Sequence, residues 1–90
     1  MLEGKIKVCN PLGLHARAAA GLVRLASGFK SKIKFRRTDN HVIADAKSIL
    51  SVLTLAASKG MELKIEVEGK DEREAMQAIE EIFSEGFGEI

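Results

Sequence analysis

Four short stretches of this chain alternate between polar and apolar residues, and this alternation restricts the possible fold more than any other feature. The clearest is residues 62–68, in which Leu63, Ile65 and Val67 fall on one side and charged residues on the other. The other three stretches span residues 5–8, 32–36 and 41–44. A period of two residues is typical of a strand with one buried and one solvated face. The pattern therefore predicts an antiparallel sheet that is covered on one face only.

Three further segments carry apolar residues at helical spacing. We expect these helices to begin near Ala16, Ser48 and Asp71 and to end near Gly28, Gly60 and Gly86. Ser48 is the predicted N-cap of the second helix, and Asp71 with Glu74 three residues later predicts a capping box for the third. The order β-α-β-β-α-β-α indicates an α+β open-faced sandwich, with three helices on one face of a four-stranded sheet. A ferredoxin-like strand arrangement stays open as an alternative.

The composition limits both the size and the chemistry of the protein. Ninety residues suffice for a single domain, residues 1–90. Four Phe and no Trp or Tyr imply an aliphatic core and argue against nucleic-acid binding by base stacking. The single cysteine, Cys9, excludes an internal disulfide and a multi-cysteine zinc site, and we expect no cofactor. Without a signal peptide or a bilayer-length apolar run, the expected location is the cytoplasm.

The net charge of +1 conceals a separation of charge along the chain. Residues 1–37 hold nine Lys and Arg against one acidic residue, whereas residues 38–90 hold five Lys and Arg against twelve Asp and Glu. A basic surface in the first part would attract acidic partners. Two solvated faces of opposite sign would explain the same counts, and the sequence does not separate these readings.

Residues 10–20 form a loop that turns into a helix, and we expect the chemistry of the protein to reside here. Pro11 and Gly13 mark the loop, and an alanine-rich run favours the helix. His15 stands where an N-cap residue is expected, and Arg17 follows two residues later. The start of a helix offers free N–H groups to an anion. This arrangement suits an imidazole that comes to carry a negatively charged group.

His15 could take part in three kinds of chemistry. Metal binding lacks a second ligand nearby in the sequence, although a distant ligand such as His41 stays open, and we predict no metal site. General base catalysis lacks a candidate nucleophile. Covalent carriage of a phosphoryl group fits best, because a neutral imidazole is nucleophilic near neutral pH and Arg17 would supply charge-assisted hydrogen bonds to the phosphate.

Three segments resemble the HPr family, the phosphocarrier proteins of the phosphoenolpyruvate-dependent phosphotransferase system. They are Asn10 to Arg17, Ala46 to Leu50, and Glu66 to Gly69 before an acidic helix. The resemblance extends over nearly the whole chain. It implies a sheet with the strand order 1-4-2-3, a bacterial cytoplasmic location, and a monomer with transient partners. It also implies that the protein is a carrier rather than an enzyme.

The resemblance also assigns roles to individual residues. His15 would accept a phosphoryl group on Nδ1 from phosphorylated Enzyme I and pass it to a histidine of an EIIA-type domain, with Arg17 stabilising the phosphate. Ser48 matches the serine that the HPr kinase/phosphorylase modifies in this family. Such a phosphate would add roughly −1.5 to −2 charges and would repel an acidic partner. This chain departs from the common family pattern at Ala18, where many members have proline, and at Ser51, where glycine is common.

The second predicted helix contains more apolar residues than one buried face requires, so we expect part of it to contact partners. The complete set of expected partner-contact residues comprises Leu14, Ala16, Ala18, Arg24, Lys47, Ile49, Leu50 and Leu53. Two alternatives remain. One is a regulatory paralogue of a nitrogen-related branch, and the other is an α+β module that binds a small molecule or RNA.

Overall fold

The computed structural model describes residues 1–89 and contains the predicted elements in the predicted order. The strands are β1 (Leu2–Lys7), β2 (Lys32–Arg37), β3 (Ile43–Asp45) and β4 (Glu62–Glu68). The helices are α1 (Ala16–Ser27), α2 (Ile49–Thr54), α3 (Glu72–Ser84) and a 3-10 turn, η1 (Gly86–Gly88).

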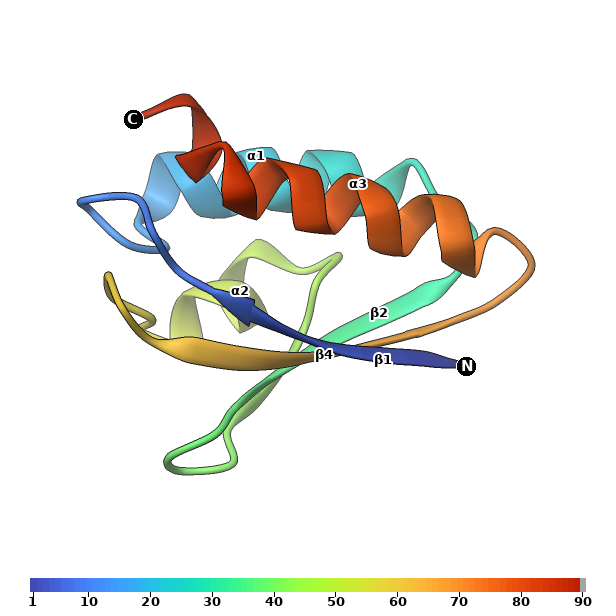
Figure 1. The fold of residues 1–90 in the computed structure, drawn as a ribbon, viewed down its shortest axis with the longest axis horizontal. Helices are drawn as coiled ribbons and strands as arrows, with labels where there is room; N and C mark the ends of the chain where they lie inside the picture. The colour runs from blue at the N-terminus through green and yellow to red at the C-terminus, as the bar shows by residue number, and fades with distance from the viewer. Residues whose placement is uncertain (90) are drawn as a thin grey trace.

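The four strands form one antiparallel sheet in the order β1-β4-β2-β3. This confirms the order 1-4-2-3 and resolves the ambiguity that the element order left. One of the two inner strands is β4, whose Leu63, Ile65 and Val67 are fully buried, as the alternation predicted. Helices α1 and α3 lie side by side over one face of the sheet (Figure 1).

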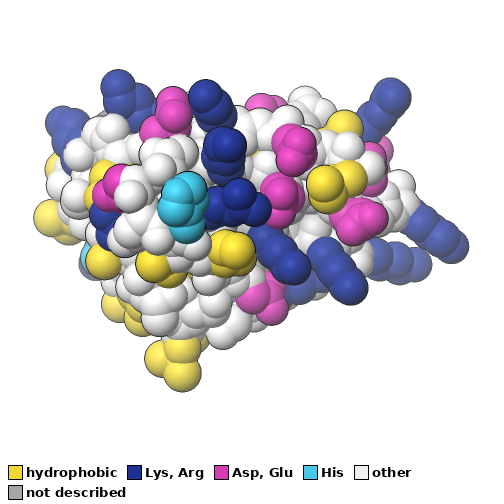
Figure 2. All heavy atoms as spheres, turned by 90° about the horizontal axis from the view of Figure 1, so that it is seen from below, with side chains coloured by type: hydrophobic (Ala, Val, Ile, Leu, Met, Phe, Trp, Pro, Cys, Tyr) yellow, Lys and Arg dark blue, Asp and Glu magenta, His cyan; other side chains and the backbone are white. Residues whose placement is uncertain are grey.

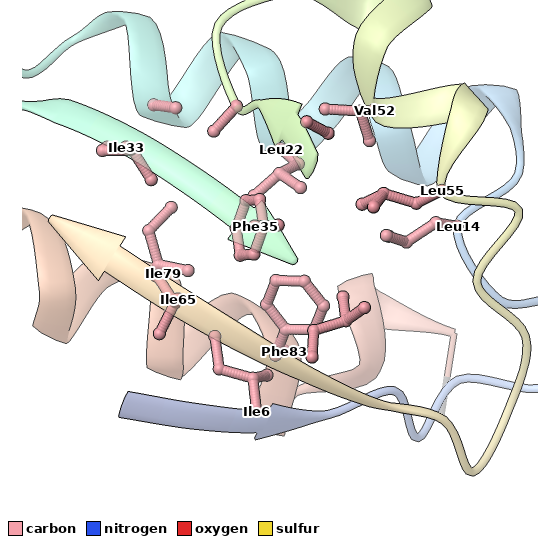
Figure 3. Packing of buried hydrophobic residues seen from close by; sticks show 14 of the residues in the cluster. Ile6, Leu14, Leu22, Ile33, Phe35, Val52, Leu55, Ile65, Ile79 and Phe83 are labelled. Atoms are coloured by element: carbon pink, nitrogen blue, oxygen red, sulfur yellow. The ribbon is translucent and has the colours of Figure 1, made fainter. Parts of the chain in front are cut away.

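The core fills the space between these helices and the sheet. It is mostly aliphatic, with Leu22, Ile33 and Ile79 among its fully buried side chains (Figure 3). Phe35 from β2 and Phe83 from α3 meet at its centre, with ring centroids 5.7 Å apart. Burying these side chains removes apolar surface from water and supplies the main driving force for the α+β arrangement.

The opposite face of the sheet is open and carries a mixture of basic and acidic side chains (Figure 2). Lys64 on β4 pairs with Lys5 on β1 and with Arg36 on β2, which places three cations in one row. Glu66 relieves part of this repulsion through an ion pair with Arg36 at 3.7 Å. Charges of both signs are present on this surface, so the open face is not uniformly basic.

Helix α2 is shorter than predicted. It ends at Thr54 rather than near Gly60, and the guanidinium of Arg37 donates to the carbonyl oxygen of Leu55 just beyond it, at 2.8 Å. Leu55 and Ala57 are nevertheless buried. The apolar residues in the sequence extend beyond the end of α2 because Leu55 and Ala57 pack into the core from a segment that is not helical.

The predicted capping box of α3 is wrong. Asp71 makes no side-chain cap hydrogen bond to its own helix. Its carboxylate instead accepts hydrogen bonds from the backbone N–H groups of Lys30 and Ser31, at 2.8 and 2.9 Å, and from the Ser31 hydroxyl. Asp71 therefore ties the start of α3 to the segment that precedes β2. The hydrogen bond from the Ser31 hydroxyl, followed by that from the Lys30 backbone, lowers the pKa of Asp71.

We expect Asp71→Asn to lower the free energy of unfolding at neutral pH, with a smaller effect in acid. The pKa of Asp71 is lower in the folded than in the unfolded chain, so its contribution is complete above the unfolded value, near 3.9, and is lost as the pH falls through the folded value. Urea denaturation between pH 2 and pH 7 measures this. Glu74→Gln is the matched control. An equal loss at every pH would contradict the role given to the Asp71 charge.

Candidate functional site

A tight turn holds the loop before α1 in place. The amide nitrogen of the buried Asn10 donates to the carbonyl oxygen of Gly13 at 2.7 Å, and the Gly13 N–H donates to the Asn10 carbonyl at 3.1 Å. Gly13 has a φ of +67°, and a Cβ there would lie 2.5 Å from the carbonyl oxygen of Ala57. Glycine is therefore required. Leu14 completes the anchor, since its N–H donates to the same Ala57 oxygen at 2.9 Å.

His15 itself is the N-cap of α1. Its backbone is extended, and its carbonyl accepts the first helical hydrogen bond from Ala19 at 2.8 Å. The imidazole Nδ1 accepts a hydrogen bond from the backbone N–H of Arg17 at 3.3 Å. Since a backbone N–H can only donate, Nδ1 carries a lone pair in this arrangement. The side chain is 27% exposed, so the ring is supported by the protein and still accessible.

Glu89 is a site residue that the sequence analysis missed. One carboxylate oxygen contacts Nε2 of His15, and the other accepts a hydrogen bond from the amide of Asn10 at 3.1 Å. The hydrogen bond from His15, followed by that from Asn10, lowers the pKa of Glu89. The C-terminal turn that carries Glu89 lies beside the start of α1 (Figure 1). No local spacing connects two residues 74 positions apart, so the sequence held no signal for this contact.

Arg17 lies in the first turn of α1 with an exposed side chain. Its guanidinium has no hydrogen-bond or ion-pair partner among residues 1–89. A groove of about 260 Å³ beside it is lined in part by Arg24 from α1 and by Glu85 and Phe87 from the C-terminal segment. The helix start therefore presents a lone pair, backbone N–H groups and an unengaged guanidinium, which together could receive a phosphoryl group.

Ser48 is the N-cap of α2, as predicted. Its hydroxyl oxygen accepts a hydrogen bond from the backbone N–H of Ser51 at 3.3 Å. The Ser51 hydroxyl in turn accepts from the Asp45 N–H at 2.9 Å. Ser51, one of the two residues that depart from the common family pattern, thus connects the end of β3 to α2.

The expected partner-contact residues divide into exposed and buried groups. Ile49, Leu50 and Leu53 on α2 are 39%, 75% and 36% exposed, and Leu12, which the sequence analysis did not select, is 70% exposed. We refer to Ile49, Leu50 and Leu53, which share α2, as the apolar patch. Ala16 and Arg24 are also exposed.

Three of the expected contact residues have side chains that are buried or held within the fold. Leu14 and Ala18 are 4% and 2% exposed, so their side chains pack in the core and offer little surface to a partner. Ala18 belongs to the inward face of α1 together with Ala19 and Leu22. The ammonium group of Lys47 donates to the carbonyl oxygen of Phe29 at 2.7 Å and is therefore engaged within the fold.

Residues 1–89 contain no group of three or more His, Cys, Asp or Glu side chains placed to hold a metal ion. No helix in this part of the chain is long and apolar enough to cross a membrane.

Comparison with known proteins identifies the family. Residues 2–85 match the family model described as "PTS HPr component phosphorylation site". The phosphocarrier protein HPr of Xylella fastidiosa (strain Temecula1) is 45% identical over 89 residues, which cover 99% of this chain and 98% of that protein. The phosphocarrier protein NPr of Escherichia coli (strain K12) is 36% identical over 84 residues, covering 93% and 92% respectively.

A solved structure is similar over the whole chain. The crystal structure of HPr-C-His from Thermoanaerobacter tengcongensis superposes with a TM-score of 0.92 at 39% identity and covers 100% of this chain and 99% of that one. The strand order, the family match and these relatives agree. The chain belongs to the HPr family of phosphocarrier proteins of the phosphotransferase system.

Proposed function

We propose that His15 accepts a phosphoryl group on Nδ1 from phosphorylated Enzyme I and passes it to a histidine of an EIIA-type domain. The observation that carries this proposal is the orientation of the ring, in which Nδ1 faces the Arg17 N–H at the start of α1. A lone pair directed at free helical N–H groups lies where an incoming phosphoryl group would find donors for its oxygens. The protein would do this as a carrier in the bacterial cytoplasm, as a monomer with transient partners.

In the accepting step, the bond between phosphorus and the donor breaks while the Nδ1 lone pair forms a new bond to phosphorus. The phosphoryl oxygens then replace Nδ1 as acceptors for the N–H of Arg17, and its guanidinium adds a charge-assisted hydrogen bond. A single arginine at an accessible site stabilises the anion moderately. This suits a carrier, because a phosphoryl group held too strongly would not be transferred onward.

The surroundings of His15 suit an acidic partner with an apolar contact surface. The apolar patch supplies area whose burial favours association, and Arg17 and Arg24 supply positive charge from α1. Complementary charge mainly accelerates encounter and fixes orientation. Such a complex would be transient, as a carrier requires when it binds its phosphoryl donor and its phosphoryl acceptor in turn.

Ser48 is the proposed regulatory site, modified by the HPr kinase/phosphorylase. Its half-buried hydroxyl begins α2 directly before Ile49 and Leu50 of the apolar patch. A phosphate at a helix start is compatible with the local fold, because it can still accept from the Ser51 N–H. The added negative charge would weaken docking of an acidic Enzyme I by repulsion.

A regulatory role in a nitrogen-related branch is the second candidate, because NPr of Escherichia coli is among the similar proteins. The identity to several HPr proteins is higher, at 45% against 36%, and this favours the HPr reading. Phosphorylation assays with the Enzyme I and EIIA-type proteins of both branches would separate the two, because the faster transfer identifies the cognate branch.

Incubation with Enzyme I and phosphoenolpyruvate should place one acid-labile phosphate on the protein. His15→Ala should gain none, because it lacks the accepting nitrogen, whereas His41→Ala should behave as the wild type. Phosphate content before and after acid treatment measures the result. Equal labelling of the His15 variant would refute the proposal.

Arg17→Ala should fold normally and transfer phosphate more slowly. Loss of a hydrogen bond to a charged group removes about 1.5 to 3 kcal/mol, which corresponds to a rate loss of about ten- to hundredfold. Rapid-quench kinetics of phosphoryl transfer from Enzyme I measure the change. Arg73→Ala, at the start of α3, is the control for loss of one positive charge. Transfer at the wild-type rate would remove Arg17 from the mechanism.

Ser48→Asp should bind Enzyme I more weakly at low ionic strength while keeping its fold, because Asp is also a good N-cap. A repulsion of about 1 kcal/mol in water corresponds to a roughly fivefold weaker affinity, and salt should reduce it. Ser48→Asn is the neutral control. Calorimetry at two salt concentrations measures the effect, and a loss that is independent of salt would contradict an electrostatic origin.

A further inference from the structure

We propose that Glu89 is a positioning residue that keeps the ring proton of His15 on Nε2, so that Nδ1 always presents its lone pair to the phosphoryl group. This inference deepens the proposed function and relies on it for its kinetic consequence. The tautomer itself is a property of the resting protein and can be measured without any partner.

Two contacts on opposite sides of the imidazole assign the same tautomer. The Arg17 N–H can only donate, so Nδ1 must accept. The ionised Glu89 carboxylate can only accept, so Nε2 must donate to it. A carboxylate on the far nitrogen of a histidine is a recurrent means of setting both the tautomer and the orientation of the ring.

Glu89 is itself held in position. The buried Asn10 directs its two amide hydrogens at the Gly13 carbonyl and at Glu89. The opposite amide orientation would face its oxygen toward two acceptors, so the assignment is unambiguous. Oδ1 of Asn10 has no partner among residues 1–89. The Asn10 side chain therefore acts within this site only as a hydrogen-bond donor.

The segment that carries Glu89 is anchored to the core. Phe87 adopts a φ of +55° within η1, and its ring packs edge-on against Phe83 at a centroid distance of 4.9 Å. The Glu89 N–H donates to the Gly86 carbonyl at 2.9 Å. An aromatic contact and a backbone turn therefore bring the carboxylate to the ring.

The contact also balances charge during transfer. When the Nδ1 lone pair bonds to phosphorus, the ring with its Nε2 proton becomes cationic, and the Glu89 carboxylate lies beside that charge. When the phosphoryl group leaves, the electron pair of the breaking bond returns to Nδ1 and the proton stays on Nε2. Neither direction requires a proton to enter or leave the ring, so the site needs no separate general base.

Two variants separate the two roles of Glu89. Glu89→Ala removes the acceptor, so the Nε2–H should exchange rapidly with water and phosphoryl transfer should slow by about ten- to hundredfold. Glu89→Gln keeps an oxygen that can accept from Nε2 but loses the charge, so the tautomer should persist while transfer still slows. Glu81→Ala, which removes an exposed carboxylate from α3, is the control and should change neither property.

The test is nitrogen-15 NMR of the His15 ring in the full chain, combined with rapid-quench kinetics from Enzyme I. The expected wild-type result is a slowly exchanging Nε2–H signal that Glu89→Ala loses. An Nε2–H that exchanges equally in both proteins would overturn the proposal, as would slow transfer in Glu89→Ala with an unchanged ring signal. A wild-type protein that accepts no phosphate would refute the proposed function while leaving the NMR result interpretable.

Discussion

The close approach of Gly13 to Ala57 is the contact on which the site depends. A Cβ at residue 13 would lie 2.5 Å from the Ala57 oxygen, and the Leu14 N–H donates to that same oxygen. One backbone carbonyl therefore connects the loop before α1 to the segment after α2. This connection holds the loop that ends at His15 against the segment that follows Ile49, Leu50 and Leu53 on α2.

The sheet could be predicted because strand alternation is a local property with a direct physical cause. Leu63, Ile65 and Val67 point to one side of β4 for geometric reasons, and all three are fully buried. The order of the strands was predicted from the family resemblance, because alternation shows which side chains share a face of a strand but not which strands pair with each other. The N-cap role of Ser48 was also predictable, because capping involves residues within one turn.

The errors occur where tertiary contacts compete with local rules. Asp71 has the spacing of a capping box, but its carboxylate accepts hydrogen bonds from the hydroxyl and the backbone N–H of Ser31 instead. Leu55 continued an apolar pattern beyond the last turn of α2 because it enters the core without helical backbone. The contact between Glu89 and His15 could not be predicted, because a contact between residues 74 positions apart produces no periodic pattern in the sequence. The sequence thus singled out His15 as the candidate reacting residue and held no sign of its contact with Glu89.

Charged side chains are arranged differently on the open face of the sheet and around the start of α1. Acidic and basic side chains are both present on the open face of the sheet, where the row of Lys5, Lys64 and Arg36 is flanked by Glu66. Around the start of α1, by contrast, the Arg17 guanidinium has no partner among residues 1–89. The separation of charge along the chain therefore does not make the open face of the sheet uniformly basic, and Arg17 stands beside His15 without an ion-pair partner among residues 1–89.

The contact between Glu89 and His15 has a consequence for the order in which the protein is made. Translation runs from the N-terminus, so His15 leaves the ribosome long before Glu89, which follows it by 74 residues. A nascent chain has its histidine and the first turn of α1 while the group that orients the ring has yet to be synthesised. The complete Asn10–Glu89–His15 network can therefore form only at a late stage of biosynthesis.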